Sequence, residues 1–156
     1  MVDRPAAGRL AAARVAAESV PDPELPAVTI ADLGILRDVA LRADGRAEIT
    51  ITPTYSGCPA MAVITLDIER AMVTAGFPDA VVRTVLAPAW TTDWLTPTAR
   101  RKLAEAGIAP PHHGPPTCPQ CGSAATETIS QFGATACKAL HRCLSCREPF
   151  EAFKCH

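Results

Sequence analysis

Two pairs of cysteines near the C-terminal end constrain the fold of this chain more than any other feature. Cys118 and Cys121 are separated by two residues, as are Cys143 and Cys146, and residues 122–142 lie between the pairs. Two such pairs can bring four thiolates to one tetrahedral ion, at a spacing close to that of zinc ribbons. The sequence therefore predicts a four-cysteine metal site, with zinc as the expected ion and iron as the alternative.

A redox role for the first pair is the competing interpretation. The stretch CPQC has the spacing of a thioredoxin-type motif, which belongs after a strand and at the start of a helix in a larger α/β domain. Here it follows a proline-rich segment, and a second pair, CLSC, matches it. Both features favour a metal site over a redox pair.

Prolines mark the boundary between two predicted domains. Residues 108–117, IAPPHHGPPT, are predicted to form a stiff linker. Residues 118–156 are too few to build a core unaided, so they need a staple, and a bound metal is one such staple. The stretches TETISQF and ALHRC can supply the strands of a ribbon. Residues 1–107 are long enough to form a domain of their own.

Hydrophobic patterning predicts an α+β fold for the first domain. Two β-favouring runs flank Asp44 and Gly45, which is the preferred chemistry for a tight hairpin turn. The stretch AMAVITLDIERAMVT has apolar residues at helical spacing. The predicted architecture is a small mixed sheet packed by helices, with a helix at 6–19, strands at 35–42 and 46–52, a helix from 59 to 75, a strand within 80–87 and a helix within 96–107.

Cys58 stands apart from the other six cysteines, in the loop TPTYSGCP. We expect it to be the N-cap of the helix that begins at Pro59, where unpaired N–H groups and the helix dipole favour a thiolate. Such a thiolate could be a nucleophile or a ligand for a transferred metal or cluster, and an inert thiol is the alternative. All four histidines lie at residue 112 or later, which disfavours a cysteine–histidine hydrolase.

Three acidic residues are weaker candidates for the same site. Asp22, Glu24 and Asp32 lie in the loop before the hairpin and could reach the same end of the domain as Cys58. Capping of backbone groups or simple solvation is the simpler explanation for each of them.

Two further cysteines and the last residue are candidates for a second site. Cys137 and Cys155 could form part of a second labile metal or cluster site, with His156 as a further ligand. The simpler explanation is a buried apolar thiol and a frayed chain end. His112 and His113 are interpreted as linker residues.

Charge and aromatic content argue against a nucleic-acid partner. The 15 basic and 16 acidic residues give a formal charge of -1, whereas nucleic-acid binders usually carry a basic surplus. Aromatic residues make up 4% of the chain, which leaves few platforms for stacking on single strands.

The apolar runs are far shorter than the roughly 20 residues of a membrane span. We therefore expect a cytoplasmic protein without a membrane partner, in which the cysteines stay reduced.

Three motifs taken together resemble the PaaD family. They are VPDPELPAVTIADLGILRDV, ITPTYSGCPAM and CPQCGS…ISQFGATACKALHRCLSCREPFEAFKC, and the match extends from about residue 10 to the C-terminus. The first two are also similar to the SufT-type group of iron–sulfur assembly factors. The resemblance implies a SufT-like domain followed by a zinc-ribbon-like module. It also implies that Cys58 is the SufT-type cysteine, that residues 22–24 are the family's DPE loop and that residues 32–34 are its DLG motif.

For function, the resemblance implies an accessory or maturation factor of the phenylacetyl-CoA epoxidase, a multicomponent monooxygenase of phenylacetate catabolism. Such a factor assists iron–sulfur cluster assembly or delivery to the reductase component and does not itself catalyse epoxidation. The expected cofactors are structural zinc and a transient iron–sulfur cluster, and the oxygenase component is a second expected partner. A structural scaffold that stabilises the complex without handling a cluster is the alternative, and a homodimer is left open.

Overall fold

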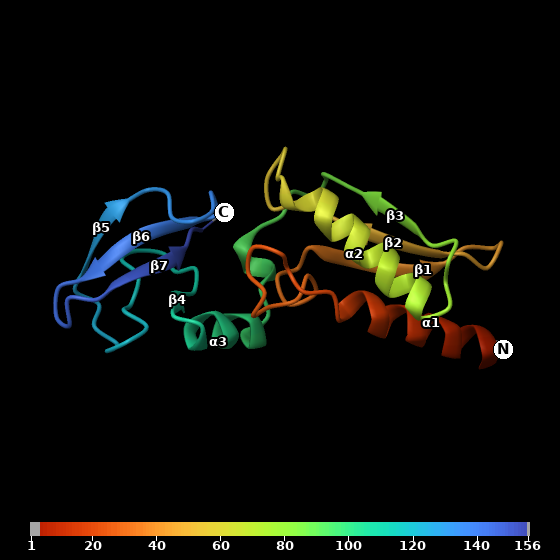
Figure 1. Cartoon of the computed structure of the whole chain (residues 1–156), viewed down its shortest axis with the longest axis horizontal. Helices are drawn as coiled ribbons and strands as arrows, with labels where there is room; N and C mark the ends of the chain where they lie inside the picture. Colours follow the sequence, from red (N-terminus) through yellow and green to blue (C-terminus); the bar gives the residue numbers. More distant parts are fainter. Residues whose placement is uncertain (1–3, 156) are drawn as a thin grey trace. The chain divides into compact units, whose positions relative to one another are not determined.

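The computed structural model describes residues 4–155 and divides into two compact units, Met1–Trp90 and Thr91–His156. Each unit has a sheet of its own (Figure 1). Within the described residues, the first sheet has three strands and the second has four. A chain of this length can therefore bury two small cores instead of one.

The first unit is built from a β-hairpin and a parallel crossover. α1 (Arg4–Glu18) leads into β1 (Leu36–Leu41), which pairs antiparallel with β2 (Ala47–Ile51). α2 (Ala60–Thr74) then connects β2 to β3 (Val81–Thr84), and β3 pairs with β2 in parallel. The sheet order β1-β2-β3 is thus mixed, which confirms the fold predicted for this part of the chain.

The core of the first unit draws on the apolar stripes of α2 and β2. Ile64, Ile68 and Met72 are fully buried, at the four-residue spacing that places them on one face of α2. Ile49 and Ile51 are fully buried at the two-residue spacing of a strand. Within residues 4–155, no helix combines the length and the apolarity that are needed to cross a membrane.

The second unit carries the predicted ribbon strands and two strands that the sequence did not indicate. β5 (Thr126–Ser130) and β6 (Lys138–Cys143) pair antiparallel. β7 (Pro149–Phe153) pairs antiparallel with the other side of β6. β4 (Ile108–Ala109) pairs in parallel with β7, so the sheet order is β4-β7-β6-β5.

The second unit begins at Thr91, whereas the sequence analysis placed the end of the first domain at residue 107. A short 3-10 helix, η1 (Thr92–Trp94), and α3 (Pro97–Glu105) both belong to the second unit. The guanidinium group of Arg100 on α3 donates a hydrogen bond to the carbonyl oxygen of Pro111 at 2.8 Å. This contact and the pairing of β4 with β7 tie the predicted helix and linker to the ribbon sheet.

Candidate functional site

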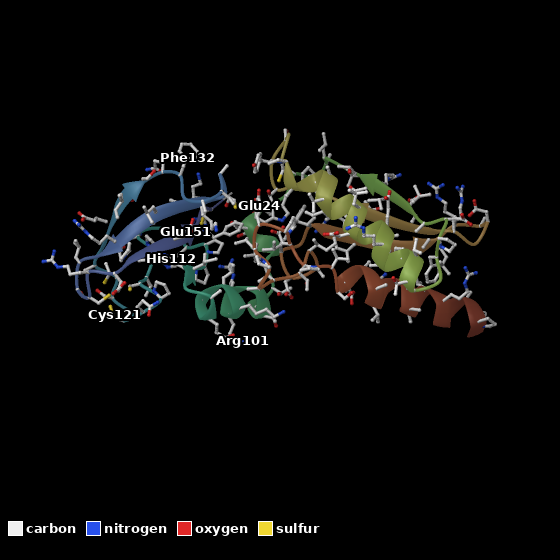
Figure 2. The ribbon with its side chains drawn as sticks, viewed as in Figure 1. Glu24, Arg101, His112, Cys121, Phe132 and Glu151 are labelled. Atoms are coloured by element: carbon white, nitrogen blue, oxygen red, sulfur yellow. The ribbon has the colours of Figure 1, made fainter. Side chains whose placement is uncertain are left out.

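The four cysteines of the two pairs lie together in the second unit, and their Sγ atoms are all within 4.8 Å of one another. The sulfurs of Cys118 and Cys146 are 3.7 Å apart, and those of Cys121 and Cys143 are 3.5 Å apart. Each close contact therefore joins one pair to the other. Cys118 and Cys143 are buried, whereas Cys121 and Cys146 are exposed, so the cluster lies at the surface of the unit (Figure 2).

This arrangement fits a tetrahedral metal ion. An ion about 2.3 Å from each of four sulfurs places those sulfurs about 3.8 Å apart. The observed separations of 3.5 and 3.7 Å are close to that value. All four donors are thiols, whose thiolate form selects zinc or iron over magnesium or calcium. The cluster could therefore hold one metal ion, with no ligand position left over for a substrate.

Backbone groups prepare the cluster for a metal. The backbone N–H of Cys146 donates to the sulfur of Cys143 at 3.4 Å. Mainly through this bond, the pKa of Cys143 is lowered to about 6. Gly122 follows the first pair with φ of 76°, and its N–H donates to the carbonyl oxygen of Cys118 at 2.9 Å. Against a backbone hydrogen bond at Glu148 that lowers it, the pKa of Cys146 is raised to about 12 by burial and by the neighbouring thiols. Metal binding requires deprotonated thiols, so it must still displace protons from the cluster.

Cys58 is not the N-cap of α2, and the sequence analysis was wrong on this point. α2 begins at Ala60 with Pro59 in the N-cap position, so Cys58 precedes the cap. The backbone N–H of Cys58 donates to the carbonyl oxygen of Tyr55 at 3.3 Å, in a turn where Gly57 has φ of 75°. Pro59 takes the cap position instead, with helical dihedral angles and no side-chain hydrogen bond to the first turn. Cys58 is half-buried and still lies at the N-terminal end of α2.

Three segments that are far apart in the sequence meet at this end of the first unit. The backbone N–H of Thr52 donates to the carbonyl oxygen of Ile35 at 2.9 Å, and the indole N–H of Trp90 donates to that of Leu33 at 2.8 Å. Figure 1 shows the α1–β1 loop, the loop before α2 and the segment after β3 at the same end. Trp90 was missed in the sequence analysis, because a contact across 57 residues leaves no local signal.

Asp22 and Asp32 organise the loop between α1 and β1. Asp22 is buried, and its Oδ1 accepts hydrogen bonds from the backbone N–H groups of Glu24 and Leu25 at 2.9 and 2.8 Å. Asp32 and Thr29 bond reciprocally, each backbone N–H donating to the other side chain at 3.1 Å. These are contacts of loop-capping side chains. The half-buried Glu24 belongs to the same loop (Figure 2), and support of Cys58 by these acids stays a prediction.

Asp22→Ala is expected to lower the free energy of unfolding by about 1–3 kcal/mol, because two backbone N–H groups lose their acceptor in a buried place. Asp22→Asn keeps one acceptor oxygen and should lower it by less. Urea unfolding followed through the amide signals of the first unit measures both changes. Equal midpoints for Asp22→Ala and the parent would show that the loop does not depend on this carboxylate.

Within residues 4–155, Cys137 and Cys155 do not form a second cluster of potential metal ligands. The four-cysteine group is the only set of three or more His, Cys, Asp or Glu residues there whose ligand atoms lie close enough together to hold one ion. Cys137 is buried in the second unit. Cys155 is exposed and lines a cavity of about 180 Å³ together with His112 and His141. His156 lies outside the described residues, so the second labile site stays a prediction.

Two family models match consecutive parts of the chain. Residues 10–86 match a model described as an iron–sulfur cluster assembly protein. Residues 110–154 match the PaaD zinc beta ribbon domain. The first match includes Cys58, and the second includes all four clustered cysteines.

Two relatives carry related names. A protein from Escherichia coli K12, named as the proposed D component of 1,2-phenylacetyl-CoA epoxidase, is 54% identical over 144 residues, which is 87% of this chain and 87% of that protein. The Fe-S protein maturation auxiliary factor YitW from Bacillus subtilis 168 is 39% identical over 91 residues, which is 56% of this chain and 86% of that protein. The match to the first relative is long enough to define the family.

A solved structure supports the fold. The crystal structure of the domain of unknown function DUF59 from Bacillus anthracis is 29% identical, with a TM-score of 0.56 over 64% of this chain and 94% of that one. Together with the ribbon match, it confirms a SufT-like domain followed by a zinc-ribbon-like module. The first unit matches an iron–sulfur cluster assembly model, the second matches the PaaD ribbon, and the chain is 54% identical to the E. coli relative over most of its length. The chain therefore belongs to the PaaD family.

Proposed function

We propose that this protein is an accessory factor of a phenylacetyl-CoA epoxidase and assists iron–sulfur cluster assembly in, or delivery to, the reductase component. One observation carries the proposal. The segment that matches an iron–sulfur cluster assembly model, residues 10–86, contains Cys58 and lies in a chain that is 54% identical to a proposed D component of such an epoxidase. The 39% identity to the maturation factor YitW supports the same role in iron–sulfur cluster assembly.

Cys58 is the residue to which we assign the transfer. It is half-buried at the N-terminal end of α2, and its thiolate can bind an iron atom of a cluster, which is the cargo of the reaction. Delivery is then a ligand exchange. The bond between the iron and the Cys58 sulfur breaks as a thiolate of the receiving protein forms its own bond to that iron. No electron is transferred, and the released Cys58 thiolate can take a proton from solvent.

The second unit is assigned a structural metal and a docking role. Zinc is the ion we assign, because a closed set of four thiolates is the arrangement of structural zinc sites. A metal held in this way keeps the ribbon rigid without taking part in the transfer. The ribbon then offers a fixed surface to the reductase component or to the oxygenase component.

Anaerobic purification followed by metal and sulfide analysis tests the proposal. We expect zinc in both the wild-type protein and Cys58→Ser, and iron with acid-labile sulfide in the wild type alone. The zinc content of Cys58→Ser serves as the internal control, because it shows that the ribbon is intact. Zinc without iron or sulfide in the wild type would favour a scaffold that stabilises the epoxidase and handles no cluster.

A further inference from the structure

The loop between β5 and β6, residues 131–137, carries an exposed aromatic side chain. Phe132 is 67% exposed, and its ring is directed away from the strands of the ribbon (Figure 2). Among residues 131–137 it is the only exposed large apolar side chain, and none of these residues is charged. Single exposed apolar side chains are ordinary on protein surfaces. Phe132 differs from them in how the loop around it is held.

A partly buried ion pair fixes this loop. The carboxylate of Glu151 on β7 accepts hydrogen bonds from the backbone N–H of Ala134 at 2.7 Å and from the ammonium group of Lys138 at 3.3 Å. The side chain of Lys138 is 6% exposed, so loss of the carboxylate would leave a buried charge without its partner. The backbone N–H of Gly133 also donates to the carbonyl oxygen of Lys138 at 2.7 Å, which closes the loop on itself.

Glycine is the residue that fits at position 133 in this arrangement. A Cβ atom there would lie 2.2 Å from Oε2 of Glu151, the atom that accepts the hydrogen bond from Ala134. A larger residue would push the carboxylate away and weaken its bonds to the loop. The backbone that carries Phe132 is therefore held in place before a partner arrives. An anchor that is held in this way loses less conformational freedom on binding, which raises affinity.

Lys154 adds a positive charge beside the ring. Its Nζ atom lies 4.5 Å from the centroid of the Phe132 ring and donates a hydrogen bond to the carbonyl oxygen of Gln131 at 2.9 Å. Within residues 4–155 the ammonium group donates this one hydrogen bond, so two of its three N–H groups are left for a partner. A protruding ring with a cation beside it is complementary to an apolar pocket with a carboxylate at its rim.

We propose that Phe132 and Lys154 form the docking surface through which the second unit binds the reductase component of the epoxidase. The ring enters an apolar pocket of that protein, and the ammonium group pairs with a carboxylate at the rim. A membrane suits this surface less well, because lipid binding draws on several apolar and several basic side chains and the surface offers one of each. The choice of the reductase rests on the proposed function, whereas the chemistry of the docking surface does not.

Calorimetric titration of the purified reductase component into the full-length zinc-loaded protein tests the ring. Phe132→Ala should raise the Kd by about 30-fold or more, which is the effect of removing an anchor residue from an interface. Leu144→Ala is the matched control, because it truncates another exposed apolar side chain, 45% exposed, just beyond the opposite end of β6. It should change the Kd by less than about threefold. Both variants should keep their zinc and their dispersed ribbon amide signals.

Two further variants test the charge and the rigidity of the loop. Lys154→Met keeps the apolar stem and should lower the association rate and the dependence of the Kd on salt. Gly133→Ala keeps both the ring and the charge, and should still raise the Kd by about 3–10-fold because the loop is no longer held. Zinc content shows whether each variant is folded. A Gly133→Ala protein that binds like the wild type would show that rigidity of the loop contributes nothing.

Equal Kd values for Phe132→Ala and the wild type would overturn the docking surface, and so would equal losses in Phe132→Ala and Leu144→Ala. Wild-type protein that binds phosphatidylserine vesicles and not the reductase, or that binds neither, would overturn the choice of partner. The proposed transfer fails separately. If the reductase binds through Phe132 and acquires its cluster equally well with Cys58→Ser, the docking surface stands and the role of Cys58 does not.

Discussion

Removing the metal from the four-cysteine cluster is expected to unfold the ribbon. Structural zinc bound by such sites contributes roughly 10 kcal/mol or more to folding. The apolar cluster beside the site cannot replace that contribution, because it consists of Ala109, Cys118, Cys143, Phe150 and Ala152. Two of these five side chains belong to the four-cysteine cluster, so the core and the cluster share residues. A strong chelator should therefore collapse the amide signals of β5, β6 and β7.

Two exposed cysteines of the second unit provide a matched pair for this prediction. Cys121 belongs to the cluster and Cys155 does not, although both are exposed. Cys121→Ser should lose metal and the ribbon signals together, whereas Cys155→Ser should keep both. The first unit should keep its amide signals in every sample, since its sheet contains no cluster residue. Dispersed ribbon signals in metal-free protein would contradict the prediction.

The four-cysteine cluster could be predicted from the sequence because its signal is local. The two-residue spacing within each cysteine pair and the number of residues between the pairs are enough to predict that four sulfurs converge. The strands that complete the second sheet, β4 and β7, were not predicted from the sequence, and the reason is physical. β4 has two residues, which is too short to show a period, and the run PFEAF of β7 resembles a loop end as much as a strand.

The site around Cys58 was only partly predictable. The glycine before Cys58 and the helix after it are local features, and both are found in the structure. The contact of Trp90 with Leu33 is not local, since its two residues are 57 positions apart. The buried hydroxyl of Thr52 has no hydrogen-bond partner among residues 4–155. This could not be predicted either, because the sequence does not show which atoms surround a threonine side chain. Contacts of this kind depend on tertiary packing, which periodicity does not encode.

Cys58→Ser is expected to prevent the partner reductase from acquiring its cluster while leaving the fold intact. A serine hydroxyl stays protonated at neutral pH and is a poor ligand for iron, so the rate of cluster acquisition should fall by about tenfold or more. The change in stability should stay within about 0.5 kcal/mol, because the side chain is half-buried, outside the core and similar in size. Iron and acid-labile sulfide in the reductase, co-produced with each variant, measure the first effect. Urea unfolding measures the second.

Two comparisons decide between transfer and scaffolding. Cys155→Ser also removes a thiol that is not buried, so normal maturation with this variant would show that the position of Cys58 matters and the number of thiols does not. Binding of the reductase by Cys58→Ser should be unchanged, because a scaffold surface does not require this sulfur. A variant that binds normally and fails to mature its partner identifies a transfer thiol. If the variant binds its partner and matures it at the wild-type rate, Cys58 has no role in the mechanism. The protein is then a scaffold that acts through its binding surfaces.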